Sequence, residues 1–161
     1  MSKVLMIIDM QKGFVKNQFF SNLVQKINKL ISLKIYDYYV FTKFVNGKNN
    51  LFINKLNWKN LLTEQSQKIC VKIPKNNIVF EKYGYGLNEE QIEKLKNILF
   101  PNSQIDLCGI ETDACVYAIA LQLFDNNLFP NILINYTYSS IDNEIIKSIL
   151  LHQFGKIDER D

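Results

Sequence analysis

The most constraining feature of this sequence is the alternation of short apolar runs with longer stretches in which apolar residues recur every three or four positions. Short apolar runs are typical of buried parallel strands, and the longer stretches are typical of helices that pack on one face. Alternating strands and helices build α/β proteins. The pattern predicts a Rossmann-like α/β fold of three layers, with helices on both faces of a mostly parallel sheet of five or six strands.

The predicted elements run along the whole chain. Strands are expected at 4–8, 38–41, 78–80, 105–109 and 132–134. Helical spacing places helices at 23–31, 87–99, 116–124 and 141–149. No linker or repeat interrupts these elements, so the 161 residues predict a single domain spanning 1–161.

Local signals mark the ends of several predicted helices. Ser21 is a candidate cap for the first helix, the second should stop before Pro101, and the last should end at Gly155. Three isoleucines at helical spacing define this last helix: Ile141, Ile145 and Ile149. Residues 43–60, rich in Asn and Lys, predict a long loop with a helical turn near Trp58.

Composition excludes several classes of function. The chain has 47% hydrophobic and 22% charged residues, as compact proteins do. Its net charge is +3, but the lysines are scattered and Arg160 is the only arginine, which argues against a nucleic-acid partner. No apolar run approaches the roughly 18–20 residues that cross a bilayer, so no membrane partner is expected.

The cysteine and histidine counts limit the chemistry further. Three cysteines (Cys70, Cys108 and Cys115) form no CxxC motif, and an odd number favours free thiols in a reducing compartment. Because the first apolar run, 4–8, is too short for a signal peptide, we expect a cytoplasmic protein. One histidine, His152, cannot form a multi-histidine zinc site, and no GxSxG motif accompanies it. No metal and no cofactor are predicted.

Polar residues stand where the predicted strands end. Asp9 follows the first strand, Lys82 follows the third, and Cys115 lies shortly after the fourth. Because ligands bind outside the carboxyl ends of parallel strands, these three side chains should meet at one edge of the sheet. There a carboxylate could take the proton of a thiol, and an ammonium could favour the thiolate.

The turn that carries Cys115 adds to this hypothesis. Thr112 and Asp113 are candidate caps for the helix that follows, and backbone N–H groups of its first turn could hold an oxyanion. Each residue also has a simpler interpretation: Asp9 as a loop cap, Lys82 as a surface lysine and Cys115 as a small buried side chain. Cys70 and Cys108 are expected to be buried filler.

Three segments together resemble the isochorismatase-like cysteine hydrolases, a family that includes nicotinamidases and carbamoyl-amide hydrolases. These segments are Val4-Leu-Met-Ile-Ile-Asp-Met-Gln-Lys-Gly-Phe14, Phe80-Glu-Lys-Tyr-Gly-Tyr85 and Cys108-Gly-Ile-Glu-Thr-Asp-Ala-Cys-Val116. The resemblance extends over essentially the whole chain. It implies a small-molecule substrate and a homo-oligomer in which a neighbouring subunit completes the pocket rim.

The resemblance also assigns roles. It makes Cys115 the nucleophile, Asp9 its general base and Lys82 the cation that stabilises the thiolate. It places a non-proline cis peptide at Ile110–Glu111, and it implies that this segment, together with Ala114, aims backbone N–H groups at the oxyanion.

Two departures from the family pattern narrow the prediction. Nicotinamidases of the family bind a metal through an Asp and two His after the second strand, but residues 42–46 of this chain contain no histidine. Classical nicotinamidase activity is therefore not expected. The segment 83–86 also differs from the usual sequence after the lysine.

Aromatic residues near the predicted edge are candidates for a substrate pocket. Phe14, Phe44, Tyr83 and Tyr85 are the principal ones, with Phe19 and Tyr117 as further candidates. Residues 135–140 either line the same pocket or form a surface loop. Exposed aromatics near residues 44–58 are expected to supply the apolar patch for self-association.

The leading hypothesis is a cysteine hydrolase that cleaves a C–N bond of a small amide or carbamoyl compound through a thioester. Two alternatives stay open. One is a non-catalytic binding or scaffold protein of the same fold. The other is a vinyl-ether hydrolase acting on an isochorismate-like diacid, for which Lys12, Lys16 and Lys43 could supply positive charge.

Overall fold

The computed structural model describes residues 2–14, 17–99 and 104–161. Its centre is a five-stranded parallel sheet with the strand order β3-β2-β1-β4-β5. The strands are β1 (Lys3–Ile8), β2 (Tyr38–Phe44), β3 (Asn77–Lys82), β4 (Gln104–Ile110) and β5 (Pro130–Tyr138). The predicted α/β class and parallel sheet are confirmed.

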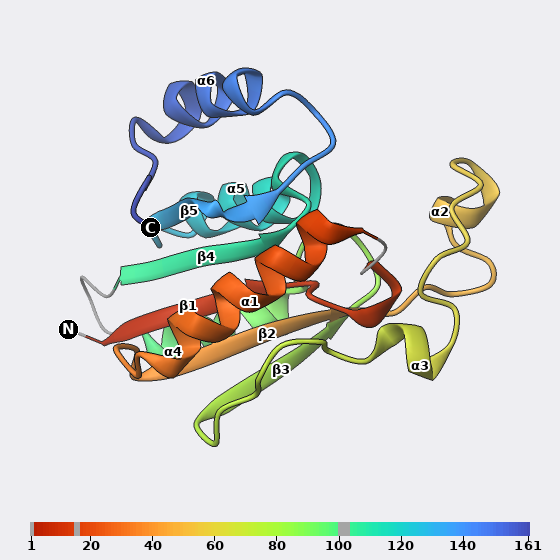
Figure 1. Ribbon diagram of the computed structural model, residues 1–161, viewed down its shortest axis with the longest axis horizontal. Coiled ribbons are helices and arrows are strands. Elements are labelled where there is room, and N and C mark those ends of the chain that lie inside the picture. The colour runs from red at the N-terminus through yellow and green to blue at the C-terminus, as the bar shows by residue number, and fades with distance from the viewer. Residues whose placement is uncertain (1, 15–16, 100–103) are drawn as a thin grey trace.

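Helices cover both faces of this sheet (Figure 1). Helix α1 (Gln18–Ser32) packs on one face. Helices α4 (Glu89–Ile98), α5 (Tyr117–Asp125) and α6 (Asn143–Phe154) contribute to the core on the other face. The short helices α2 (Leu51–Asn54) and α3 (Glu64–Gln67) lie between β2 and β3. No helix among the described residues is long and apolar enough to cross a membrane.

The pleat of β1 separates the two cores. Val4, Met6 and Ile8 face the core beneath α4 and α5, whereas Leu5 and Ile7 face the core beneath α1. All five side chains are fully buried. A strand buried on both faces must be apolar at every position, which explains why the run 4–8 has no polar alternation.

The order in which successive strands are added to the sheet reverses beside β1. The chain moves outward from β1 to β2 and β3, then crosses to β4 and continues to β5 on the other side. The carboxyl ends of β1 and β4 therefore form the topological switch point, where open parallel sheets bind ligands.

Several predicted boundaries need correction. Helix α1 begins earlier than Ser21, because the side chain of Asn17 accepts a hydrogen bond from the N–H of Phe20 and caps the helix. Strand β5 continues four residues beyond its predicted end at 134, and β2 continues three residues beyond its predicted end at 41. Polar side chains also fit the ends of strands, so the apolar runs alone did not mark these ends. The helical turn of the 43–60 segment is α2, before Trp58. Pro101 lies outside the described residues.

The last helix ends at Gly155 as predicted, where a φ of 69° suits glycine. Its apolar stripe faces outward, however. Ile145 and Ile149 of α6 are 56% and 45% exposed, while Ile146 and Leu150 are buried. Ile141, also exposed, precedes the helix. Helical spacing alone does not distinguish which of two apolar stripes faces the core.

Candidate active site

Asp9 and Lys82 meet at the carboxyl ends of β1 and β3. The Nζ atom of Lys82 lies 2.8 Å from Oδ2 of Asp9, and both side chains are 1% exposed. Lys82 Nζ also lies 2.9 Å from the carbonyl oxygen of Gly84 and 3.2 Å from that of Tyr85. Because carbonyl oxygens and a carboxylate surround it, the ammonium is compensated despite its burial.

Cys115 completes this cluster from the other side of the switch point. Lys82 Nζ lies 3.2 Å from Cys115 Sγ. The thiol belongs to a single π-helical turn, Thr112–Val116, which connects β4 to α5. The structure thus brings together Asp9, Lys82 and Cys115, which are separated widely in the sequence. Their catalytic roles stay predictions.

The thiol of Cys115 favours its protonated form in this free site. Burial, and then the charge of Asp9, raise the pKa of Cys115 to about 12, although the charge of Lys82 lowers it. The expected effect of Lys82 on the thiolate has the right sign, but burial outweighs it. The free protein therefore favours the thiol over the thiolate at Cys115.

Thr42 holds the carboxylate of Asp9 in place. Its hydroxyl donates to Asp9 Oδ1 at 2.7 Å and accepts from the Asp9 N–H at 3.1 Å. Asp9 itself has a φ of 50°, a left-handed conformation that Asp tolerates better than most residues. Oδ2 accepts no well-directed hydrogen bond from any described residue. One oxygen is thus anchored by Thr42, and the other forms the ion pair with Lys82.

Gln11 ties together the loops that surround Asp9. Its side-chain amide donates to the carbonyl oxygens of Phe44 and Gln67 and accepts from the Phe44 N–H, each at 2.9 Å. It is fully buried, and its hydrogen bonds span three separate segments. This explains why a polar residue two positions after Asp9 is needed for structure.

The backbone before Cys115 requires a glycine. Gly109 has a φ of 115°, and a Cβ atom there would lie 2.1 Å from the carbonyl oxygen of Ile8. The next peptide bond, Ile110–Glu111, is cis. The N–H of Ala114 donates to the Glu111 carbonyl oxygen at 3.1 Å, within the turn. The oxyanion role of these residues stays a prediction.

The predicted helix caps at Thr112 and Asp113 are wrong. Both residues lie inside the π turn, whose capping residue Glu111 makes no side-chain cap. Thr112 is buried, and Asp113 instead accepts a short hydrogen bond from Ser139, just after β5. The turn begins one residue earlier than the sequence suggests, so these side chains serve packing and loop attachment.

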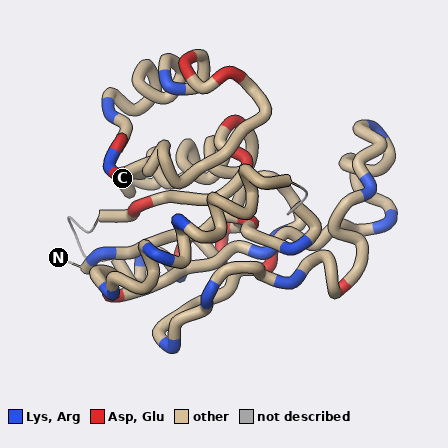
Figure 2. The backbone as a smooth tube through the Cα atoms, in the orientation of Figure 1, with Lys and Arg blue, Asp and Glu red and all other residues tan. Residues whose placement is uncertain are grey.

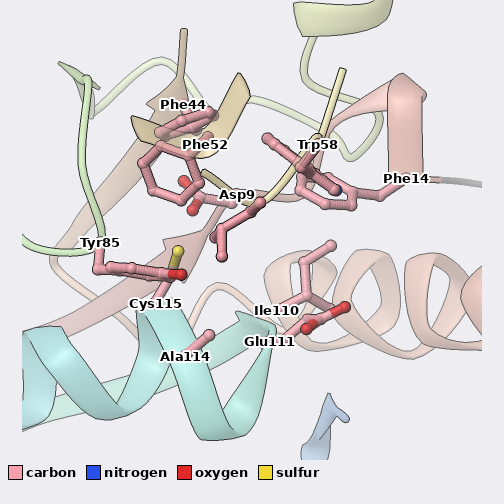
Figure 3. Close-up of a pocket in the computed structure, with 11 residues that line it drawn as sticks. Asp9, Phe14, Phe44, Phe52, Trp58, Tyr85, Ile110, Glu111, Ala114 and Cys115 are labelled. Carbon is pink, nitrogen blue, oxygen red and sulfur yellow. The ribbon is translucent and has the colours of Figure 1, made fainter. Parts of the chain in front are cut away.

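A cavity of about 240 Å³ opens at this cluster. Figure 3 shows Tyr85 on one side, Phe44 and Phe52 above, and Trp58 with Phe14 on another side. Asp9, Cys115, Ile110, Glu111 and Ala114 also line it, together with Leu56. Of the six aromatic candidates from the sequence, Phe14, Phe44 and Tyr85 face the cavity; whether they bind substrate stays a prediction.

The other aromatic candidates lie elsewhere. Tyr83, just after the end of β3, is 65% exposed. Phe19 packs on Tyr138, and Tyr117 on Phe154. Residues 135–140 are not among those that line the cavity.

Sequence reasoning missed Phe52, Leu56 and Trp58. All three come from the α2 segment (residues 48–60), which stands beyond the carboxyl ends of the strands (Figure 1). The prediction of an exposed aromatic patch in this region is wrong, because these aromatics turn toward the cavity. The exposed apolar residues are Leu51 and Leu56. The only available signal was aromatic content within a polar loop.

Residues 42–46, at the end of β2 and just after it, do not fit the metal site of nicotinamidases. Thr42 is bound to Asp9, and Asn46 donates to the carbonyl oxygens of Trp58 and Asn60. The single histidine, His152, is exposed on α6. Within the described ranges, no group of three or more His, Cys, Asp or Glu side chains could hold a metal ion.

Charge is dispersed over the rest of the molecule. Lys and Arg occur along the helices, at the sheet edges and on the α2 segment (Figure 2). The absence of a nucleic-acid partner stays a prediction, for which this dispersion is the relevant observation.

The chain is similar in sequence to one protein family and in structure to several solved proteins. Residues 3–142 match the sequence profile of the isochorismatase domain. No curated protein sequence matches the chain. Among solved structures, a pyrazinamidase from Pyrococcus horikoshii in complex with zinc is similar at 16% identity, with 98% of each chain covered and a TM-score of 0.79.

Two further structures are similar over nearly their full length. An N-carbamoylsarcosine amidase from Thermoplasma acidophilum has 16% identity and a TM-score of 0.82, covering 98% of this chain and 96% of that chain. A nicotinamidase from Bacillus subtilis has 18% identity and a TM-score of 0.82, covering 99% of this chain and 100% of that chain. At such identities the likeness shows the fold alone.

Proposed function

This chain belongs to the isochorismatase family of hydrolases, and we propose that it is a cysteine hydrolase that cleaves a C–N bond of a small amide or carbamoyl compound. One observation carries the proposal: a single buried ammonium, Lys82 Nζ, contacts both the Asp9 carboxylate and the Cys115 sulfur at the wall of a cavity. Acid, cation and nucleophile in contact are the components of thiol-dependent acyl transfer.

The first half of the reaction forms a thioester. As Cys115 attacks the carbonyl carbon, its proton moves to Oδ2 of Asp9, the oxygen that accepts no directed hydrogen bond. The protonated Asp9 then gives this proton to the leaving nitrogen, and the C–N bond breaks. Because the thiol has a raised pKa in the free site, deprotonation must accompany attack.

The second half restores the enzyme. Water attacks the thioester carbon while Asp9 takes one of its protons, the C–S bond breaks, and Asp9 returns the proton to sulfur. Throughout, Lys82 balances the negative charge that moves between Asp9 and Cys115. Backbone N–H groups of the turn 111–116 are proposed to hold the oxyanion.

The charges around the cavity do not favour the vinyl-ether alternative. A diacid substrate needs cations, but Lys82 is paired with Asp9, and Lys43 is paired with Glu81 at 2.8 Å. Neither Lys12 nor Lys43 lines the cavity. Lys16 lies outside the described residues.

A panel of small amides and carbamoyl compounds, scored by ammonia release, tests the proposal. Wild type should release ammonia from at least one member, Cys115→Ala from none, and exhaustive EDTA treatment should change nothing. Ammonia release from no member would contradict the amidase and favour the non-catalytic alternative. Equal release by the variant would contradict the thiol mechanism. A requirement for added zinc would contradict the metal-free mechanism.

We also propose that the protein is cytoplasmic and forms a homo-oligomer. Three free cysteines suit a reducing cytoplasm. A homo-oligomer is supported by exposed apolar side chains on two surfaces, Leu51 with Leu56 beside the cavity and Ile145 with Ile149 on α6. Light scattering that gives the monomer mass at micromolar concentration would contradict it.

A further inference from the structure

Four aromatic rings form a continuous wall of the cavity. The Phe52 ring centroid lies 4.9 Å from that of Phe44, 4.9 Å from that of Tyr85 and 5.9 Å from that of Trp58. All four side chains line the cavity (Figure 3). Aromatic faces attract cations that lie within about 6 Å of a ring centroid, and cages of such rings recognise quaternary ammonium groups. An uncharged flat ligand would also fit this wall, so the charge of the site must distinguish between a cationic and an uncharged ligand.

Glu111 supplies an uncompensated negative charge to the same cavity. Its carboxylate is half-buried, and no described cation forms an ion pair with it. Burial, and then the charge of Asp113, raise its pKa. A carboxylate that has lost water without gaining a cation is costly in the free protein, and a cationic ligand would remove that cost.

The remaining charges of the cavity cancel. Asp9 and Lys82 form an ion pair, so the cluster with Glu111 has a net charge of −1 when both carboxylates are ionised. Lys82 itself lies 5.2 Å from the Phe44 ring centroid, so this ring already faces one cation. The cavity therefore opposes anionic groups and attracts compact cations.

We propose that the substrate is a small amide whose other end is a compact ammonium cation, bound between the aromatic wall and Glu111. The inference rests on the proposed function, because the substrate is an amide only if the protein is an amidase. In Figure 3, Glu111 and Tyr85 lie on opposite sides of Cys115 and Ala114. The cation would thus be held beside the thiol, with the carbonyl carbon within its reach.

Binding can be measured without turnover. Trp58 is the only tryptophan, and it lines the cavity, so its fluorescence reports occupancy. In Cys115→Ala, choline should change this fluorescence at a concentration about tenfold or more below that of 3,3-dimethylbutanol, its uncharged carbon isostere. Equal affinity for the two compounds at constant ionic strength would overturn the inference.

Two variants assign the preference to particular residues. Glu111→Gln, made in the Cys115→Ala background, should bring the affinity for choline close to that for the alcohol. Glu81→Gln, which neutralises an exposed carboxylate outside the cavity, is the matched control and should leave the preference unchanged. An unchanged preference in Glu111→Gln would overturn the role of Glu111. Phe52→Leu, which removes one ring of the aromatic wall, should weaken choline binding.

Turnover then separates this inference from the proposed function. Wild type should hydrolyse trimethylammonioacetamide with a kcat/KM about tenfold or more above that for 3,3-dimethylbutanamide, which differs only by carbon in place of charged nitrogen. Choline preference without ammonia from any amide would contradict the amidase and leave the cation site standing. Ammonia release with equal kcat/KM for the two amides would overturn the cation inference and leave the amidase standing.

Discussion

Two buried carboxylates at opposite ends of the sheet have very different surroundings. Asp106, near the amino end of β4, is 3% exposed, and both of its oxygens accept hydrogen bonds. Tyr36 donates to Oδ2 at 2.7 Å, while Gln104 and Asn131 donate to Oδ1 at 2.6 and 2.7 Å. Arg160 adds a longer contact of 3.4 Å.

Asp9, at the carboxyl end of β1, is equally buried but less completely bonded. Thr42 donates to Oδ1, whereas Oδ2 forms the ion pair with Lys82 and accepts no well-directed hydrogen bond from any described residue. Asp9 also lines the cavity with Cys115. A saturated carboxylate contributes to stability and has no acceptor capacity left for a substrate. An undersaturated one beside a cavity can accept a proton. Hydrogen-bond saturation, rather than burial, distinguishes the structural carboxylate from the proposed catalytic one.

The largest expected effect on turnover comes from comparing two cysteines, Cys115 at the cavity and Cys108 in the core. Cys115→Ala should lower turnover by about 10⁴-fold or more, because it removes the proposed nucleophile. Cys108→Ala should retain turnover and lose about 1 kcal/mol of stability, since Cys108 is fully buried in β4. Ammonia release and urea unfolding on both variants check this. Retained turnover in Cys115→Ala would remove the basis of the comparison.

Lys82→Met should lower turnover by about 10²-fold, because charge stabilisation in the transition state is lost. Lys82 lowers the pKa of Cys115, so its removal should move the pH dependence of iodoacetamide alkylation to still higher pH. The matched control is Lys43→Met, which removes an exposed ion pair with Glu81. An unshifted alkylation curve with normal turnover would show that Lys82 is not part of the site.

Asp106→Ala should cost about 3 kcal/mol of folding stability, because it leaves several buried donors without an acceptor. Turnover per folded molecule should stay unchanged at temperatures where the variant is folded. Tyr36→Phe, which removes one donor, should cost about 1 kcal/mol. A large loss of kcat in either variant, measured beside urea unfolding, would show that the two ends of the sheet are not independent.

The smallest expected effect concerns the anchor of Asp9. Thr42→Val keeps the side-chain shape but loses the hydrogen bond to Oδ1, so kcat should fall about tenfold with little change in KM. Thr42→Ser should restore most of it, which a purely structural role through the methyl group would not predict. Equal kcat in all three proteins would mean that Lys82 alone positions Asp9.

Much of the fold was predictable because its signals are local. The uninterrupted apolar run 4–8 indicates a strand buried on both faces, and parallel strands place their carboxyl ends at one edge. That rule alone brings Asp9, Lys82 and the segment before Cys115 together. Strand ends and the cap of α1 were less predictable, because Thr, Asn and Tyr fit strands, turns and caps alike.

What the sequence by itself determined is the parallel α/β sheet and the identity of the polar residues at its carboxyl edge. Tertiary structure decided which aromatics reach that edge: Phe52 and Trp58 arrive from the α2 segment, while Tyr83 turns outward. It also decided that burial raises the pKa of Cys115 and that Glu111 has no counter-ion among the described residues. These properties depend on burial and on contacts between segments distant in the chain, and no local pattern encodes them.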